Sequence, residues 1–355
     1  MTDAPMTAPG PSTATAGEIL SRHLTAQAGA FLRALPQAVG EVGSRPGAVV
    51  LPSAGTSDLL RAVRRIGGAL HTFAASFEEA WAEESRRELR WLLNLLAQEP
   101  GYLRRSARLL AALDSLSGSE PDGPGMLAGH AGAPKARALL DRQLTLARTR
   151  AHSAVLQDLR SARLHALADR MTLLVGETPL LAAGGELAPQ AAGALDALAA
   201  GARALPLDRA STPYGGDGLR RLGSVPAPAR AQAPAVRGLL DADAALAADD
   251  APWHRVRILV KRARYALEVC ARPAAGLDGL DRVLGRHQEA SDAAVTAATA
   301  ARTPRITPAT AYVLGVVHAD QRLEVEAARY AFGRQWPELS LGLDAWGAPP
   351  APRMA

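Results

Sequence analysis

Residues 253–268 read Trp-His-Arg-Val-Arg-Ile-Leu-Val-Lys-Arg-Ala-Arg-Tyr-Ala-Leu-Glu. Because a helix turns about 100° per residue, a helical stretch of this sequence gathers four basic or chargeable side chains within an arc of about 80°. These side chains are His254, Arg257, Lys261 and Arg264. Like charges at such spacings repel one another, so the stripe predicts a surface that meets an anion. Ile258 and Leu259 leave part of the turn for packing.

A weaker copy of this stretch lies in the first half of the chain, at residues 56–70. It aligns without gaps at an offset of 197 positions, the distance from Ser57 to His254. Arg64 and Arg65 match Lys261 and Arg262, and uncharged residues stand at the positions of His254, Arg257 and Arg264, namely Ser57, Leu60 and Gly67. An offset this long lies outside the period of solenoid repeats and indicates a duplicated half of the molecule.

The composition of the whole chain is that of a helical protein with a core. Of its 355 residues 48% are hydrophobic and 21% are charged, which is ordinary for a folded chain. Aromatic residues make up only 4%, and this favours helix over sheet. No segment shows sustained alternation of polar and apolar residues, so an all-α protein is predicted. The length fits one large or two medium domains.

Charge and cysteine content indicate a basic cytosolic protein. The formal net charge is +5, and Lys135 and Lys261 are the only lysines, so arginine supplies nearly all of the basic residues. Guanidinium groups suit bidentate contacts to phosphate. Cys270 is the single cysteine, which fits a reducing compartment. The N-terminus lacks the pattern of a signal peptide, and no uncharged apolar run reaches about 18 residues, so we expect a cytoplasmic protein without a membrane span.

Helical periodicity sets the expected boundaries of the domain. Residues 1–15 and 341–355 are expected to form tails, the first of them disordered. The range 16–340 is expected to form the folded domain, with an N-terminal helical half at 16–175 and a C-terminal helical half at 190–340.

Proline and glycine predict where this domain is interrupted. The stretch 205–234 is rich in Pro, Gly and Arg and predicts a flexible linker or an ordered excursion. Pro100-Gly101 predicts a break between two helices, and Pro252 is expected to begin a new helix. The long helical stretch from Lys135 to Leu174 is expected to kink near Asp158.

The two basic stretches resemble the CHAD family, the conserved histidine α-helical domain. The family pattern is roughly His-x-x-Arg-x-x-x-Arg-Arg-x-Arg, followed by Ala-Leu-x-x-Phe in the first half and by Tyr-Ala-x-Glu in the second. The second copy here matches at His254, Arg257, Lys261, Arg262, Arg264, Tyr265, Ala266 and Glu268. The first copy matches at Arg64, Arg65, Ala69, Leu70, Thr72 and Phe73. The resemblance covers roughly residues 16 to 340.

This resemblance implies both a fold and a ligand. The implied fold is a pair of four-helix bundles, related by a pseudo-twofold axis, whose basic helices line a central positive groove or channel. The implied ligand is inorganic polyphosphate. Some members of the family are fused to a triphosphate-processing CYTH domain, and the Glu-x-Glu-x-Lys motif of that domain is missing from this sequence. A stand-alone CHAD protein is therefore expected, cytoplasmic and associated with polyphosphate granules.

The resemblance places the polyphosphate-binding side chains on the two basic helices. The expected set is Arg61, Arg64, Arg65, His254, Arg257, Lys261, Arg262 and Arg264. Arg148 and Arg322, on other long helices, are expected to line the walls. Arg61 lies next to Leu60 and is expected to replace part of the charge missing there. His254 can donate to a phosphate oxygen and gains charge as the pH falls.

The losses in the first copy leave alternatives open. They predict binding that is weaker or more one-sided than that of a member with both copies intact. A protein-interaction scaffold with a decayed anion site is one alternative, and a general polyanion binder that meets nucleic acid non-specifically is another. Few aromatic residues lie near the basic helices, which disfavours base stacking. The residues alone also allow a solvated basic face in which Glu268 braces Arg264.

The sequence lacks the motifs of a phosphate-binding loop, a nucleophilic serine turn and a zinc site. Both lysines lack the Gly-Lys-Ser/Thr context of a phosphate-binding loop, and neither a Gly-x-Ser-x-Gly turn nor a His-Glu-x-x-His site occurs. His287, Glu289 and Asp292 are spaced so that only the last two share a helix face, which disfavours a metal site. We therefore expect a non-enzymatic protein with no catalytic residue, metal or cofactor.

Overall fold

The structure is a computed structural model that describes residues 15–44, 54–120, 123–181, 185–207, 235–274 and 276–347. Helices dominate this part of the chain, and its only strands are the antiparallel pair β1 (Ser119–Glu120) and β2 (Gly123–Pro124). The all-α fold class is thus confirmed. No helix in the described ranges is both long and apolar enough to cross a bilayer.

The helices follow the order that periodicity predicts. The N-terminal part comprises α1 (Ala16–Ser44), α2 (Ala54–Thr72), the short 3-10 helix η1 (Ala74–Ser76), α3 (Glu79–Ser117), α4 (Ala133–Asp158) and α5 (Ala162–Gly176). The C-terminal part comprises α6 (Leu187–Arg203), α9 (Ala235–Val269), α10 (Leu277–Ala301) and α11 (Pro308–Gly347). Helix α11 runs past the expected domain end at residue 340. The expected tail 1–15 and the stretch 205–234 lie almost wholly outside the described residues.

Polar side chains cap the starts of α3 and α5. Glu78 accepts hydrogen bonds from the backbone N–H groups of Ala80 and Trp81 ahead of α3. The Ser161 hydroxyl accepts from Leu164 N–H at the start of α5. These caps satisfy N–H groups that have no partner inside the helix. Ser161 therefore separates α4 from α5 completely, where the sequence predicted only a kink near Asp158.

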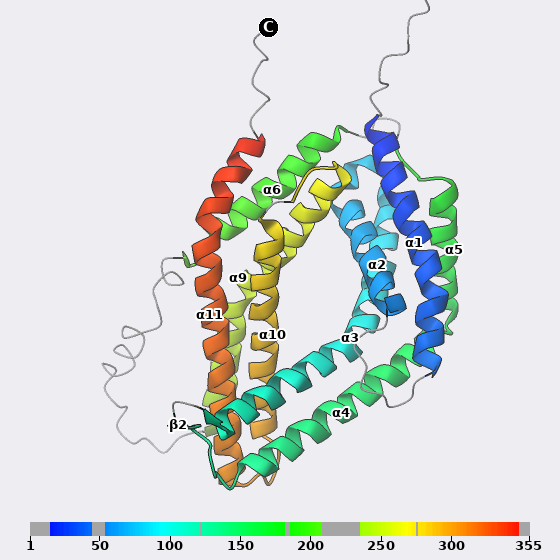
Figure 1. Ribbon diagram of the computed structural model, residues 1–355. Coiled ribbons are helices and arrows are strands. Elements are labelled where there is room, and N and C mark those ends of the chain that lie inside the picture. The colour runs from blue at the N-terminus through cyan, green and yellow to red at the C-terminus, as the bar shows by residue number, and fades with distance from the viewer. Residues whose placement is uncertain are drawn as a thin grey trace, which may run out of the picture.

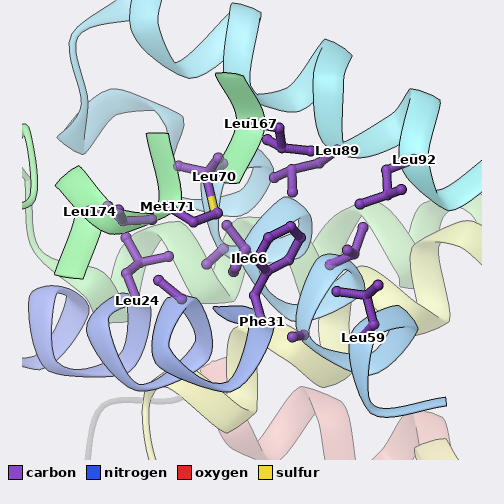
Figure 2. Close-up of a cluster of buried hydrophobic side chains, with 14 of the residues drawn as sticks. Leu24, Phe31, Leu59, Ile66, Leu70, Leu89, Leu92, Leu167, Met171 and Leu174 are labelled. Carbon is purple, nitrogen blue, oxygen red and sulfur yellow. The ribbon is translucent and has the colours of Figure 1, made fainter. Parts of the chain in front are cut away.

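Buried apolar side chains form three clusters rather than one core for each half. The first is formed mainly by α1, α2, α5 and the first part of α3, includes Phe31, Ile66 and Met171 (Figure 2), and also takes in residues of α4, α6 and α9. The second joins α6, α9, α10 and α11 around Trp253 and Phe332. The third is formed by the ends of four helices, two from each half of the chain.

In the third cluster the far ends of α3 and α4 meet α10 and α11. Leu113 of α3 and Leu140 of α4 pack there with Ala297 of α10 and Leu314 of α11. Figure 1 shows α3 and α4 running side by side toward the lower end of α11. The third cluster thus connects the two halves of the chain. The pseudo-twofold relation of the halves stays a prediction.

Two prolines that were predicted to break helices lie inside them instead. Helix α3 continues through Pro100, and α9 continues through Pro252. A proline inside a helix costs about 3 kcal/mol. In α3 this cost is offset because Leu96 before the proline is buried in the first cluster and Leu109 after it in the third. The predicted breaks were therefore wrong, because packing on both sides outweighs the local preference.

Candidate anion-binding site

Helices α2 and α9 cross in close contact at Gly68 and Tyr265, and both residues are buried. A Cβ atom on Gly68 would lie 2.6 Å from Cδ2 of Tyr265, which is closer than real contacts allow. Only glycine therefore permits this approach. The crossing brings together the two helices that carry the basic stretches.

On one side of the crossing, basic side chains from three helices come together. This group, called the basic cluster below, consists of Arg64 of α2, Arg104 of α3, and Arg257, Lys261 and Arg264 of α9. Lys261 and Arg264 share a counter-ion from α10, since Lys261 Nζ lies 2.6 Å from Asp281 Oδ1 and Arg264 donates to Asp281 Oδ2 at 2.9 Å. Asp278 lies 3.2 Å from Arg264. One carboxylate thus holds two of the cations.

Two arginines of the basic cluster lack an acidic partner. Within the described residues, no carboxylate forms a hydrogen bond or ion pair with Arg64 or Arg257, and Arg257 Nε is buried without a hydrogen-bond partner. Partial burial lowers the pKa of Arg64, and the charges of Arg257 and Arg104 lower it further against the opposing effects of Tyr265 and Asp281. Two guanidinium groups close together repel each other, so their proximity is unfavourable for the fold.

Lys261 shows the same crowding of positive charge. Burial lowers the pKa of its ammonium group, and although Asp281 acts to raise it, the charges of Arg257 and Arg64 lower it again. A nearby anion would favour the charged form of this lysine. The basic cluster therefore has both the charge and the unused donors to receive an oxyanion.

His254 lies at the edge of the basic cluster, one turn before Arg257. Its Nε2 is buried without a hydrogen-bond partner, and its ring meets the ring of His287 edge-on, with centroids 5.4 Å apart. Burial lowers the pKa of His254, so the ring is neutral at pH 7. The predicted gain of charge therefore requires a pH below the usual range of histidine.

A buried ion network anchors this part of α9 to α10 and α11. Asp250, only 2% exposed, accepts hydrogen bonds from Ser291 at 2.6 Å, from Arg322 at 2.7 and 3.1 Å, and from Arg329 at 2.6 Å. Arg329 also donates to Nε2 of His287 at 3.3 Å. Arg322, which was expected on the wall of a groove, makes its polar contacts with Asp250 inside the protein. The network holds the helix immediately before the basic stripe.

The remaining predicted residues lie apart from the basic cluster. Arg65 forms an ion pair with Glu268 at 2.8 Å, so Glu268 braces Arg65 and not Arg264. Arg61 pairs with Asp58 on the exposed side of α2. No interaction among the described residues joins Arg61 or Arg148 to the cluster. Arg262 points to another side of α9, toward Arg90.

Two members of the site were missed by the sequence reasoning. Arg104 lies with Arg105 and Arg108 in a stretch whose helical pattern does not show which of its faces lies toward α2 and α9. Arg104 lies 3.4 Å from Glu289 of α10. The counter-ion Asp281 could have been suspected only from its spacing of three residues from Asp278.

The positions lost from the first copy differ in their surroundings. Leu60 is buried in the first apolar cluster, where an arginine could not be solvated. Gly67 has open space around it, because a Cβ there meets nothing within 4 Å. In the described part of the chain, no three His, Cys, Asp or Glu side chains are placed to hold a metal ion.

Comparisons with known proteins show what this chain is similar to. The model of a family described as the CHAD domain matches residues 48–301. The solved structure of PptA from Streptomyces chartreusis is 42% identical, with a TM-score of 0.72 over 91% of this chain and 100% of that one. The CHAD domain from the plant Ricinus communis is 18% identical, with a TM-score of 0.48 over 93% and 98% of the two chains. No curated protein matches the chain.

Proposed function

Because this chain belongs to the CHAD-domain family, we propose that it binds inorganic polyphosphate through the basic cluster, without turning it over. Polyphosphate is the ligand that the family resemblance implies. The observation that carries the proposal is that Arg64 and Arg257, from two helices, lie close together and lack an acidic partner among the described residues. A phosphate chain offers the missing negative charge at each successive unit.

The energetics of the fold support a binding role for these side chains. Packing of α2 on α9 requires Gly68 and Tyr265, and it does not require the charges of Arg64 and Arg257. Clusters of like charge that oppose folding are typical of functional sites. Guanidinium groups bind phosphate oxygens through short charge-assisted hydrogen bonds, so bound polyphosphate would convert a repulsion into an attraction.

The aromatic side chains near the cluster favour polyphosphate over nucleic acid. Tyr265 is buried against Gly68, so its ring is not available to stack on a base. The guanidinium of Arg105 lies over the ring of Tyr102, the aromatic residue closest in sequence to Arg104, 5.5 Å from its centroid. Binding of single-stranded nucleic acid usually relies on exposed aromatic platforms. DNA is therefore expected to compete only weakly, through charge alone.

A salt series tests the proposal. Binding of long-chain polyphosphate would be measured at several salt concentrations for the wild type and for the double variant Arg64→Gln/Arg257→Gln. The logarithm of the binding constant should fall linearly with the logarithm of salt concentration, and the variant should lose about 0.7–0.9 of slope for each phosphate contact removed. A DNA competitor would be included at each salt concentration.

The matched control is Arg142→Gln/Arg334→Gln, which removes the same charge from exposed positions on α4 and α11. It should keep the wild-type slope. Equal losses in both variants would show that only net charge matters, which supports a general polyanion binder. No binding at low salt by a folded protein would support the scaffold alternative.

Non-catalytic binding has two further consequences that can be measured. The chain-length distribution of polyphosphate should be unchanged after prolonged incubation with the protein, as seen on a gel. A fluorescent fusion should coincide with polyphosphate granules in cells that contain them, and the Arg64→Gln/Arg257→Gln variant should be more diffuse.

A further inference from the structure

Positive charge also gathers on another side of the α2–α9 crossing. Arg262 follows Lys261 and therefore points about 100° further around α9. There it is joined by Arg90 of α3 and His71 of α2, and the charges of Arg262 and Arg90 both act on the His71 ring. The Arg86 guanidinium donates to the Leu70 carbonyl at 3.3 Å, which fixes this face of α3 against the last turn of α2.

This second group also lacks a counter-ion. Within the described ranges, neither Arg262 nor Arg90 forms a hydrogen bond or ion pair with a carboxylate, whereas the neighbouring Arg86 pairs with Glu83 at 2.6 Å. Arg262 is half-buried, and Arg90 and His71 are exposed. The group is therefore accessible to a ligand from solvent.

The offset between the two basic stretches shows that a carboxylate is missing beside Arg262. Moving by 197 positions takes Gly68 to Tyr265 and Arg64 to Lys261. Gly68 contacts Tyr265 across the crossing, and Arg64 lies near enough for its charge to act on Lys261. Such contacts are expected when a local twofold axis exchanges the two basic helices. Under this exchange, a contact between one residue of α2 and one of α9 has a counterpart between their equivalents on the opposite helices.

Such an exchange would also relate the two outer sides of the crossing. It takes Arg65 to Arg262, and it takes Glu268 back to His71. Arg65 is neutralised by Glu268 at 2.8 Å. On the equivalent side Arg262 lies near enough for its charge to act on His71, a residue without negative charge. The carboxylate of Glu268 therefore marks, by symmetry, the place beside Arg262 where an anion would lie.

We propose that Arg262, Arg90 and His71 form a second anion site that binds a phosphate group in the position that Glu268 fills beside Arg65. Two guanidinium groups supply charge-assisted hydrogen bonds, and the imidazole adds a third donor when it is protonated. The choice of polyphosphate as the source of that group rests on the proposed function, while the site itself requires only a phosphoryl anion.

The protonation of His71 gives this site a direct reporter. Burial lowers the pKa of His71, the charges of Arg262, Arg86 and Arg90 lower it further, and Glu83 acts in the opposite direction. The ring is therefore neutral at pH 7 without ligand. A phosphate bound beside it would favour the charged ring, so the pKa should rise on binding.

The experiment follows the His71 ring by NMR during pH titrations with and without tripolyphosphate. In the wild type the ligand should raise the pKa by about one unit, equivalent to tenfold tighter binding to the protonated form. The rise should disappear in Arg90→Gln/Arg262→Gln. It should persist in Arg64→Gln/Arg257→Gln, where the basic cluster is weakened. No ligand-dependent shift at saturating tripolyphosphate would overturn the proposal.

A second variant tests the argument from symmetry. His71→Glu supplies a built-in carboxylate beside Arg262, as Glu268 does beside Arg65, and should abolish phosphate binding at this site while stabilising the fold. His71→Gln is the matched control, because it removes the titrating ring without filling the site, and it should keep most of the binding. If both variants bind equally well, the site does not exist.

Two probes separate the possible sources of the phosphate. If one long chain contacts both clusters, His71→Glu should reduce the salt slope for long-chain polyphosphate. If only short phosphates enter, the same variant should lose one tripolyphosphate site and leave the long-chain slope unchanged. Tripolyphosphate could still raise the pKa of His71 while Arg64→Gln/Arg257→Gln binds long-chain polyphosphate as tightly as the wild type. That result would refute binding through the basic cluster but would support the second site.

Discussion

At the scale of single residues, Asp281 both stabilises the basic cluster and competes with its ligand. Its carboxylate holds Lys261 and Arg264 at 2.6 and 2.9 Å, and it occupies the donors that a phosphate would use. An internal acid of this kind orders the cations and competes with the ligand at the same time. Arg64 and Arg257 have no such partner, and we infer that they make the first contacts with an incoming anion.

Replacing Asp281 by Asn keeps its shape and removes its charge. The free energy of unfolding should fall by about 1–3 kcal/mol, because two charge-assisted hydrogen bonds weaken. The affinity for polyphosphate should rise several-fold, because the freed donors become available. Denaturant titrations and binding measurements would check both. Asp278→Asn, at an exposed carboxylate, is the control with little expected effect. A joint loss of stability and affinity would mean that ordering the cations outweighs competition.

Gly67 offers a way to restore the incomplete first stretch. It stands at the position of Arg264 in the second stretch and has open space around it. Gly67→Arg should tighten polyphosphate binding and should add up to about 1 kcal/mol of stability through helix propensity. Gly67→Gln would share the propensity gain without the charge. Equal affinity of the two variants would show that this side of α2 does not face the ligand.

At the scale of the helices, the close crossing of α2 and α9 makes a sharp prediction at Gly68. Alanine gains about 1 kcal/mol over glycine in a helix, but overpacking typically costs about 1–3 kcal/mol. Because the new Cβ would meet Tyr265 at 2.6 Å, Gly68→Ala should lower the free energy of unfolding and weaken polyphosphate binding. Gly67→Ala is the matched control and should stabilise the protein. Stabilisation by both would show that the helices separate freely.

The two basic helices could be predicted from the sequence, whereas their partners could not. The stripe of Arg257, Lys261 and Arg264 follows from helical periodicity alone. Arg104 and Asp281 reach it from α3 and α10, and only the packing of those helices reveals their positions. Periodicity shows which residues share one helix face, but not which face of another helix lies opposite.

Local rules failed where long-range packing outweighed them. Pro100 and Pro252 are typical helix breakers, yet each lies in a helix that is anchored on both sides. In α9 the anchors are the ion network of Asp250 before the proline and the buried Trp253 directly after it. Neither anchor has a signal in the local sequence, because both depend on α10 and α11.

At the scale of the whole molecule, histidines with lowered pKa values should make stability depend on pH. Burial lowers the pKa of His23, His71, His254 and His287, the last to about 3. The unfolded chain takes up protons below about pH 6.5 while the folded protein does not, so stability falls as the pH drops through that range. For His287 the loss continues to about pH 3, at no more than about 1.4 kcal/mol per pH unit.

Denaturant titrations between pH 7 and pH 4 would measure this loss. His287→Gln keeps an acceptor for Arg329 and should flatten the curve below pH 6. At Asp250 burial acts to raise the pKa, but hydrogen bonds from Arg322 and Ser291 lower it below its ordinary value. Its stabilising contribution is therefore complete at neutral pH and is lost only as the pH falls below about 3.8. Constant stability from pH 7 to pH 5 would contradict the lowered pKa values of these histidines.

The central claim is that the basic cluster opposes folding and favours ligand binding. Thermal unfolding of the wild type and of Arg64→Gln/Arg257→Gln, each with and without polyphosphate, tests both halves of it at once. Without ligand the variant should melt at the higher temperature, because repulsion is relieved. With polyphosphate the wild type should rise more and overtake the variant. A variant that melts lower without ligand, and that polyphosphate stabilises as much as the wild type, would contradict the account.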